Sequence, residues 1–99
     1  MTAMTEIRRT VGFTRWLDRL RDRRAQRRIA ARIRRLSAGY PGDVRPVGEG
    51  VFEMRIDYGP GYRVYFIRRG EAVIILLAGG DKDSQERDVR RARELAREL

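Results

Sequence analysis

The sequence predicts an α+β domain: a small, mostly antiparallel sheet packed against an N-terminal helical hairpin and a C-terminal helix. Three observations lead to this prediction. Apolar and polar residues alternate along residues 52–58 and 63–67, which is the period of half-buried strands. Apolar residues recur at helical spacing towards both ends of the chain, and short glycine-containing turns join the strands between them. A chain of 99 residues has room for one modest core, so we expect a single domain over residues 1–99.

The first forty residues predict one strand and two helices. Residues 5–11 are rich in β-branched side chains and form the expected first strand. The apolar residues of the first helix are Phe13, Trp16, Leu17 and Leu20, and those of the second helix are Ile29, Ile33 and Leu36. Asp22 lies between the two patterns as a break or N-cap, and the second helix ends near Gly39. Two helices joined by so short a link predict a hairpin.

The remainder of the chain predicts a loop, three strands and a final helix. Residues 39–50 hold two prolines and four glycines and form the loop, with a short extended segment at residues 43–47. Strands at residues 52–58 and 63–67 are joined by a turn at Gly59-Pro60-Gly61, and residues 72–78, apolar on both faces, predict a central covered strand. Residues 83–86 resemble a capping box for the last helix. The apolar stripe of that helix is Val89, Ala92, Leu95, Ala96 and Leu99.

The composition excludes several kinds of chemistry. The chain has no cysteine, which excludes disulfides and thiolate metal sites and makes the cytoplasm the expected location. It has no histidine, the commonest general acid or base, and no group of Asp and Glu residues at metal-binding spacing. We therefore expect neither a metal nor another cofactor. We also expect no membrane partner, because the sequence shows no membrane-spanning run and no signal peptide.

The net charge of +9 points to an anionic partner. Lys82 is the only lysine, so 22 of the 23 basic residues are arginine, whose planar fork matches phosphate oxygens. Coding composition is the alternative reason for this bias. The outer face of the second predicted helix is the densest part: Arg23, Arg24, Arg27, Arg28, Arg32, Arg34 and Arg35. Two interpretations stay open here, an ordinary solvated face of an amphipathic helix and a docking surface for ribosomal RNA or an acidic protein segment.

The predicted hairpin at residues 52–67 gathers the residues that fit phosphate chemistry. If Gly59-Pro60-Gly61 is the loop tip, Asp57 faces Arg63, Arg55 faces Tyr65 and Glu53 faces Ile67, all on one face of the sheet. Phe52, Met54, Ile56, Val64 and Phe66 form the opposite, core-facing side. Lys82 follows Gly79-Gly80 at the rim. The polar face is either a solvated face with cross-strand ion pairs, such as Asp57–Arg63 and Glu53–Arg55, or a surface that binds RNA or phosphate.

Several motifs, in order along nearly the whole chain, resemble the RelE/ParE toxin superfamily of bacterial toxin–antitoxin modules, in particular its HigB-like branch. Phe13-x-x-Trp16-Leu17 resembles the opening of the family's helical hairpin, and residues 42–51 resemble its central loop. The most specific segments are Glu53-Met54-Arg55-Ile56, Gly59-Pro60-Gly61-Tyr62-Arg63-Val64-Tyr65 and Leu76-Leu77-x-Gly79-Gly80-Asp81-Lys82-x-x-Gln85-x-x-Asp88.

The resemblance implies a toxin held inactive by a cognate antitoxin, often a HigA-like helix-turn-helix protein. RelE- and HigB-like members cleave messenger RNA in the ribosomal A site, whereas ParE-like members inhibit DNA gyrase. In the cleaving members, basic residues on the sheet strands hold the scissile phosphate while the 2′-hydroxyl attacks it. In this sequence, Arg63 takes the place of the family's sheet arginine and Arg55 that of a preceding basic residue, and Lys82 lies near a later basic position. Independently of the resemblance, the charge pattern assigns RNA binding to six arginines of the second helix: Arg23, Arg24, Arg27, Arg28, Arg32 and Arg35.

The chain departs from several cleaving members because no tyrosine or histidine lies near the end of its last helix. The acid and the base therefore stay open, with Lys82 as a candidate acid, Glu53 as a candidate base, and Tyr65 in stacking or proton transfer. A ribosome-dependent endoribonuclease, a gyrase inhibitor and an inactive remnant are the three functions under consideration.

Overall fold

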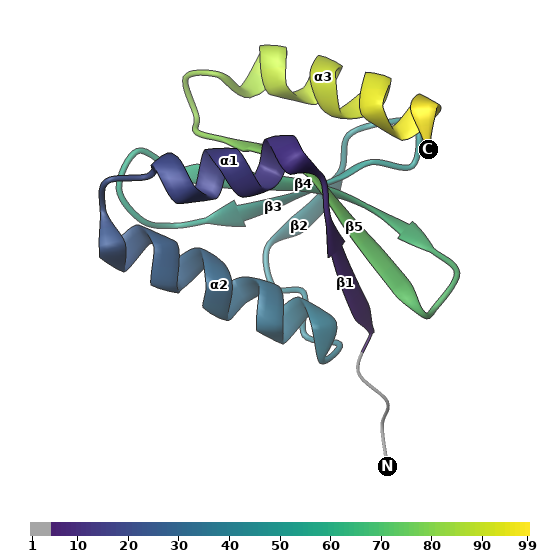
Figure 1. Ribbon diagram of the computed structural model, residues 1–99, viewed down its shortest axis with the longest axis horizontal. Coiled ribbons are helices and arrows are strands. Elements are labelled where there is room, and N and C mark those ends of the chain that lie inside the picture. Colours follow the sequence, from purple (N-terminus) through teal and green to yellow (C-terminus); the bar gives the residue numbers. More distant parts are fainter. Residues whose placement is uncertain (1–4) are drawn as a thin grey trace.

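The computed structural model describes residues 5–99 and has the predicted α+β architecture (Figure 1). The strands are β1 (Glu6–Arg9), β2 (Val44–Pro46), β3 (Phe52–Ile56), β4 (Tyr62–Arg69) and β5 (Val73–Gly80). The helices are α1 (Val11–Arg19), α2 (Arg23–Ser37) and α3 (Gln85–Glu98). The helical hairpin, the short strand at residues 43–47 and the final helix are thus confirmed.

The strands form one sheet in the order β1-β5-β4-β3-β2. β1 pairs with β5 in parallel, and the other three pairings are antiparallel. β5 therefore lies between two strands, as its apolar sequence predicts, because a central strand that is covered on both faces has no polar side to display.

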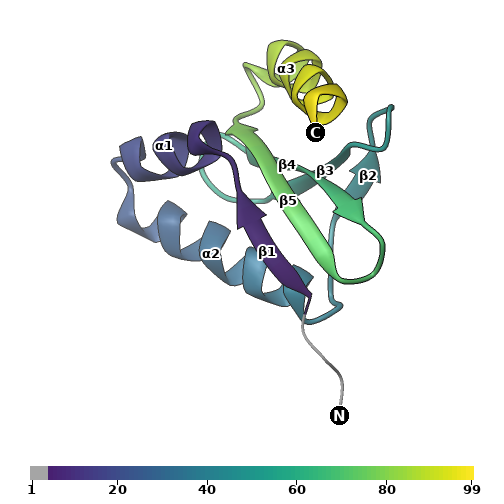
Figure 2. The same ribbon diagram turned by 45° about the vertical axis from the view of Figure 1, so that its right-hand side comes forward.

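Helices cover both faces of this sheet (Figure 2). The core on one face joins α1 and α2 to the sheet: Phe13, Leu17, Ile29, Ile33, Leu36, Met54, Ile56, Val64, Phe66, Ile74 and Leu76. The smaller core on the other face lies under α3: Val51, Tyr65, Ile67, Ile75, Leu77 and Ala92. The alternative of a solvated polar face is therefore wrong, although the Glu53–Arg55 ion pair predicted with it is present at 2.9 Å. Apolar residues alternate onto both faces of β4 and β5, so α3 is needed to remove the second set from water.

The register of the β3–β4 hairpin differs from the prediction by two residues. Arg55 pairs with Arg63, and Glu53 pairs with Tyr65. The turn occupies residues 57–61, where the Tyr58 N–H donates to the Ile56 carbonyl oxygen at 2.9 Å, so Asp57 belongs to the turn and does not face Arg63. A shift of two residues keeps each side chain on its side of the sheet. The prediction that Arg55, Arg63 and Tyr65 share a face opposite Met54 and Val64 is confirmed.

Two predicted element boundaries also differ. Val11 belongs to α1 because the Thr10 hydroxyl accepts from the Phe13 N–H at 3.0 Å and so caps that helix. Ser84 precedes α3 but makes no side-chain cap, so the predicted capping box does not form. The Asp81 carboxylate instead accepts from the backbone N–H groups of residues 83 and 84. The Asp22 N-cap of α2 is as predicted, with hydrogen bonds from the N–H groups of residues 24 and 25 at 2.9 and 3.2 Å.

Candidate functional site

Three basic residues from three neighbouring segments lie at one end of the sheet. Arg55 on β3 pairs directly with Arg63 on β4, and Arg63 pairs in turn with Gly80 on β5. Lys82 follows β5 and lies against the hairpin turn, where its N–H donates to the Pro60 carbonyl oxygen at 3.4 Å. The fold therefore brings together Arg55, Arg63 and Lys82, which are far apart in sequence.

Arg63 is a buried cation with unused donors. Its residue exposure is 9%, and its Nε and Nη1 atoms have no hydrogen-bond partner among residues 5–99. Arg63 is the cross-strand partner of Arg55, a second residue of like charge. A buried donor without a partner costs about 1–3 kcal/mol, so the burial of these two atoms carries a penalty in the folded state.

A pocket of about 240 Å³ lies at the hairpin turn beside Arg55 and Arg63. Its lining comprises Asp43, Arg55, Ile56, Asp57, Gly61, Tyr62 and Arg63. The two arginines supply planar forks that suit bidentate binding of phosphate.

Glu53 lies at the base of the site as a fully buried carboxylate. Its Oε1 accepts from Arg55 Nε at 2.9 Å, and its Oε2 accepts from Gln85 Nε2 at 2.9 Å and from the Tyr65 hydroxyl at 3.2 Å. Burial by itself raises the pKa of Glu53, but these hydrogen bonds and the charge of Arg63 outweigh burial and lower that pKa below 4.5. Glu53 is thus a charged acceptor whose two oxygens are both engaged, which does not suit a general base.

Tyr65 is also fully buried. Burial, followed by the charge and the hydrogen bond of Glu53, raises the pKa of Tyr65 well above its usual value of 10. The phenol therefore stays protonated at neutral pH and donates to Glu53. Neither stacking on a base nor proton abstraction fits this position, so both predicted roles are replaced by that of a hydrogen-bond donor.

Gln85 is a site residue that the sequence interpretation missed. It is the first residue of α3, and through Glu53 it joins that helix to β3. Its position three residues after Lys82 in a specific motif was the available signal.

Charges of both signs meet at the site. Arg55, Arg63 and the exposed Lys82 are three cationic side chains, and Glu53 with the pocket-lining Asp43 and Asp57 are three acidic ones. Within residues 5–99, Lys82 forms no ion pair, and no group of three or more Asp and Glu side chains is arranged to hold a metal ion. The arrangement can bind a phosphate group and stabilise additional negative charge on it.

The sequence and the fold both have known relatives. Residues 15–99 match the family described as "Phage derived protein Gp49-like (DUF891)". The chain belongs to this Gp49-like family of RelE/HigB-type toxins. An uncharacterized protein of Haemophilus influenzae is 47% identical over 94 residues, which cover 95% of each chain. A chain of the toxin–antitoxin complex RelBE2 from Mycobacterium tuberculosis shares the fold, with a TM-score of 0.62 and 19% identity over 80% of this chain and 99% of that one.

The Gp49-like chain also carries the arginine face predicted on α2. All but one of the predicted arginines are exposed, and none of the exposed ones forms an ion pair within residues 5–99: Arg23, Arg24, Arg27, Arg28, Arg34 and Arg35. Arg28 lies over the Tyr58 ring at 4.7 Å. Arg32 is half-buried and donates to the carbonyl oxygens of Arg55 (2.6 Å) and Pro41 (3.1 Å), so it supports the fold beneath the site.

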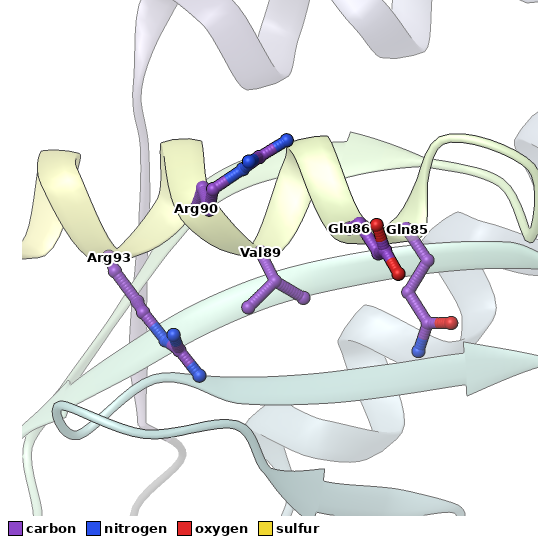
Figure 3. A pocket seen from close by; sticks show the side chains of 5 residues that line it. All are labelled: Gln85, Glu86, Val89, Arg90 and Arg93. Atoms are coloured by element: carbon purple, nitrogen blue, oxygen red, sulfur yellow. The ribbon is translucent and has the colours of Figure 1, made fainter.

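A second hollow of about 390 Å³ lies along α3, lined by Gln85, Glu86, Val89, Arg90 and Arg93 (Figure 3). Figure 3 shows Gln85, Val89 and Arg93 pointing from α3 towards the strands. Arg93 donates through Nε to the Val47 carbonyl oxygen at 2.8 Å and so fastens α3 to the loop before β3. No helix in the described part of the chain has the length and apolar character needed to cross a membrane.

Proposed function

We propose that this Gp49-like protein is the toxin of a type II toxin–antitoxin module and that it inhibits translation by cleaving ribosome-bound messenger RNA. The observation that carries the proposal is the pair of facing arginines, one of them buried with unpartnered donors, in a pocket next to the only lysine. Membership of a toxin family and the fold shared with a chain of a toxin–antitoxin complex support it.

The proposed reaction is attack of an RNA 2′-oxygen on the adjacent phosphorus. The 2′-hydroxyl loses its proton to solvent water, the new P–O2′ bond forms, the P–O5′ bond breaks, and the 5′-oxygen takes a proton from Lys82. The products are a 2′,3′-cyclic phosphate, or the 3′-phosphate that forms when water opens it, and a 5′-hydroxyl. Arg63 and Arg55 stabilise the extra charge on the pentavalent phosphorus, and a fixed donor of this kind contributes roughly 10²–10³-fold.

Lys82 is the residue we assign to the leaving 5′-oxygen. Its side chain is exposed at the rim, it forms no ion pair within residues 5–99, and an ammonium group can both hold a phosphate oxygen and donate a proton. Without histidine, the protein relies on the ribosome to align the 2′-oxygen with the phosphorus, since correct orientation replaces part of the acid and base catalysis.

The exposed arginines of α2 are the proposed contact with RNA outside the pocket, because positively charged side chains without ion pairs release counterions from a phosphate backbone. The proposed inhibitor is a cognate antitoxin, HigA-like and with a helix-turn-helix, that carries acidic residues. Charge of opposite sign accelerates such an association and makes it salt-sensitive. The cytoplasm, where translating ribosomes are found, is the proposed location.

The test is induction of the parent and of three variants, Arg63→Ala, Arg55→Ala and Lys82→Ala, in growing cells, with mapping of messenger RNA ends. Each variant is first checked for folding and for binding to the product of the adjacent gene. We expect the parent to arrest growth with cleavage inside codons, and each variant to lose cleavage while it keeps antitoxin binding.

Three variants that all cleave like the parent would place the site elsewhere. Growth arrest with intact messages and blocked DNA supercoiling would favour the gyrase inhibitor. A protein that neither arrests growth nor binds the neighbouring gene product would not be an active toxin.

A further inference from the structure

Both oxygens of the buried Glu53 carboxylate are engaged in hydrogen bonds with other side chains. One oxygen holds Arg55 at 2.9 Å, while Gln85 at 2.9 Å and Tyr65 at 3.2 Å hold the other oxygen. Glu53 comes from β3, Tyr65 from β4 and Gln85 from α3, so three elements fix the orientation of this carboxylate. A carboxylate fixed in this way is a rigid support for the cation that it contacts.

The contact to Arg55 leaves the functional end of that side chain free. Glu53 takes the Nε atom only, and the two terminal nitrogens of Arg55 have no hydrogen bond to residues 5–99. Arg55 is 28% exposed at its side chain and lines the pocket, so these terminal nitrogens can face a bound phosphate. Glu53 also faces the charge of Arg63, and it prevents two adjacent guanidinium groups from repelling each other out of position.

We propose that Glu53 is a positioning residue that aims the Arg55 guanidinium at the scissile phosphate, and that Gln85 and Tyr65 hold Glu53 for this task. The inference rests on the proposed function for its catalytic part. The role lies in orientation and charge, and no proton passes through Glu53.

If Glu53 were instead the general base, replacing Gln85 would change kcat in the opposite direction. Gln85→Leu removes a donor that stabilises the carboxylate, so the proton affinity of Glu53 rises. A base would then work as well or better, and kcat would hold or increase. If Glu53 instead positions Arg55, loss of the hydrogen bond from Gln85 lets Arg55 move, and kcat falls.

The experiment compares the parent with Gln85→Leu, Glu53→Gln and the control Glu94→Gln. Glu94 is an exposed α3 carboxylate whose contact, with Arg91 at 3.5 Å, lies away from the site. Steady-state cleavage of a message in purified translating ribosomes gives kcat and KM for each protein.

We expect Gln85→Leu to lower kcat roughly five- to tenfold with KM unchanged, since one hydrogen bond is lost. Glu53→Gln should lower kcat roughly 10- to 100-fold while KM stays equal or falls, because Arg55 loses its support but the site loses one negative charge. The Glu94→Gln protein should match the parent.

A second readout does not depend on cleavage. In ¹⁵N-labelled protein, the Arg55 Nε–H signal, assigned with Arg55→Lys, should be protected from exchange in the parent and in Glu94→Gln and lost in Glu53→Met, which has no acceptor oxygen. A parent that cleaves together with a Gln85→Leu protein whose kcat is unchanged or raised would overturn the proposal. If the parent does not cleave, the proposed function fails, and the Nε–H signal decides the positioning alone: its persistence in Glu53→Met overturns it, and its loss supports it.

Discussion

Replacing Arg63 by methionine should stabilise the protein while it abolishes phosphate binding. Methionine keeps an unbranched, flexible stem of similar length and carries no donors. The parent buries Arg63 to 9% exposure with two unpartnered nitrogen atoms, beside a second arginine. Removing the guanidinium therefore removes a penalty from the folded state along with the function.

The size of the effect follows from these contacts. A buried donor left without a partner costs about 1–3 kcal/mol, and two such atoms are present. Loss of the attraction between Arg63 and Glu53 acts in the other direction, but Glu53 retains its hydrogen bonds from Arg55, Gln85 and Tyr65. We expect a net increase of about 1–2 kcal/mol in the free energy of unfolding. For a domain of this length, each kcal/mol raises Tm by about 4–8 °C.

The assay is urea denaturation and thermal melting of parent, Arg63→Met and the control Arg15→Met, each with and without inorganic phosphate. Arg15 is exposed on α1, so its replacement should change stability little. Phosphate at 100 times its Kd should stabilise the parent and Arg15→Met by about 2.7 kcal/mol and leave Arg63→Met unchanged. A destabilised Arg63→Met protein, or one that phosphate still stabilises, would refute the assignment of Arg63 as an unsatisfied anion-binding group.

Three further predictions concern the fold and its pH dependence. A Cβ at Gly79 would overlap the Trp16 ring, so Gly79→Ala should destabilise the protein by about 1–3 kcal/mol in urea titrations. In the control Gly12→Ala in α1, the nearest atom is 3.9 Å away, and stability should change by at most about +0.5 kcal/mol. Equal effects of the two substitutions would contradict this packing. Asp22→Ala should destabilise by about 1 kcal/mol through loss of the α2 N-cap, and an unchanged Tm would count against that cap. The folded pKa of Glu53 lies below 4.5, so its contribution to stability is present above that pH and is lost as the pH falls through the folded value. The free energy of unfolding of the parent should therefore decrease more steeply than that of Glu53→Gln between pH 6 and pH 3. Parallel curves for the two proteins would contradict the direction of the pKa shift.

Side-chain alternation predicted the face of each hairpin residue correctly but not its partner. Met54 and Val64 lie in one core, and Arg55 and Arg63 lie on the other side, as the period of two requires. The pairing itself depends on where the turn begins, and residues 57–61 are compatible with several turns. Since the predicted and observed registers differ by two residues, the error did not change any face.

The covering of β3 and β4 by α3 was not predicted, because the polar residues of a strand do not indicate whether a helix packs over that face of the sheet. Ile67, Ile75 and Leu77 on that face were the signal, and their burial under α3 also buries Tyr65 and Glu53. Sequence alone therefore proposed Glu53 as a base and Tyr65 as a stacking group. Their contacts replace these roles with a buried network completed by Gln85, whose place in the motif that contains Lys82 was the one signal for it.

The most direct test of the central claim is the chemistry of the messenger RNA ends produced by purified protein in a reconstituted translation reaction. The account predicts cleavage within the codon in the ribosomal A site, with a 2′,3′-cyclic phosphate or a 3′-phosphate on the upstream fragment, a 5′-hydroxyl on the downstream fragment, and no cleavage by Arg63→Met. Intact messages with the parent protein, or fragments that carry a 5′-phosphate, would contradict it.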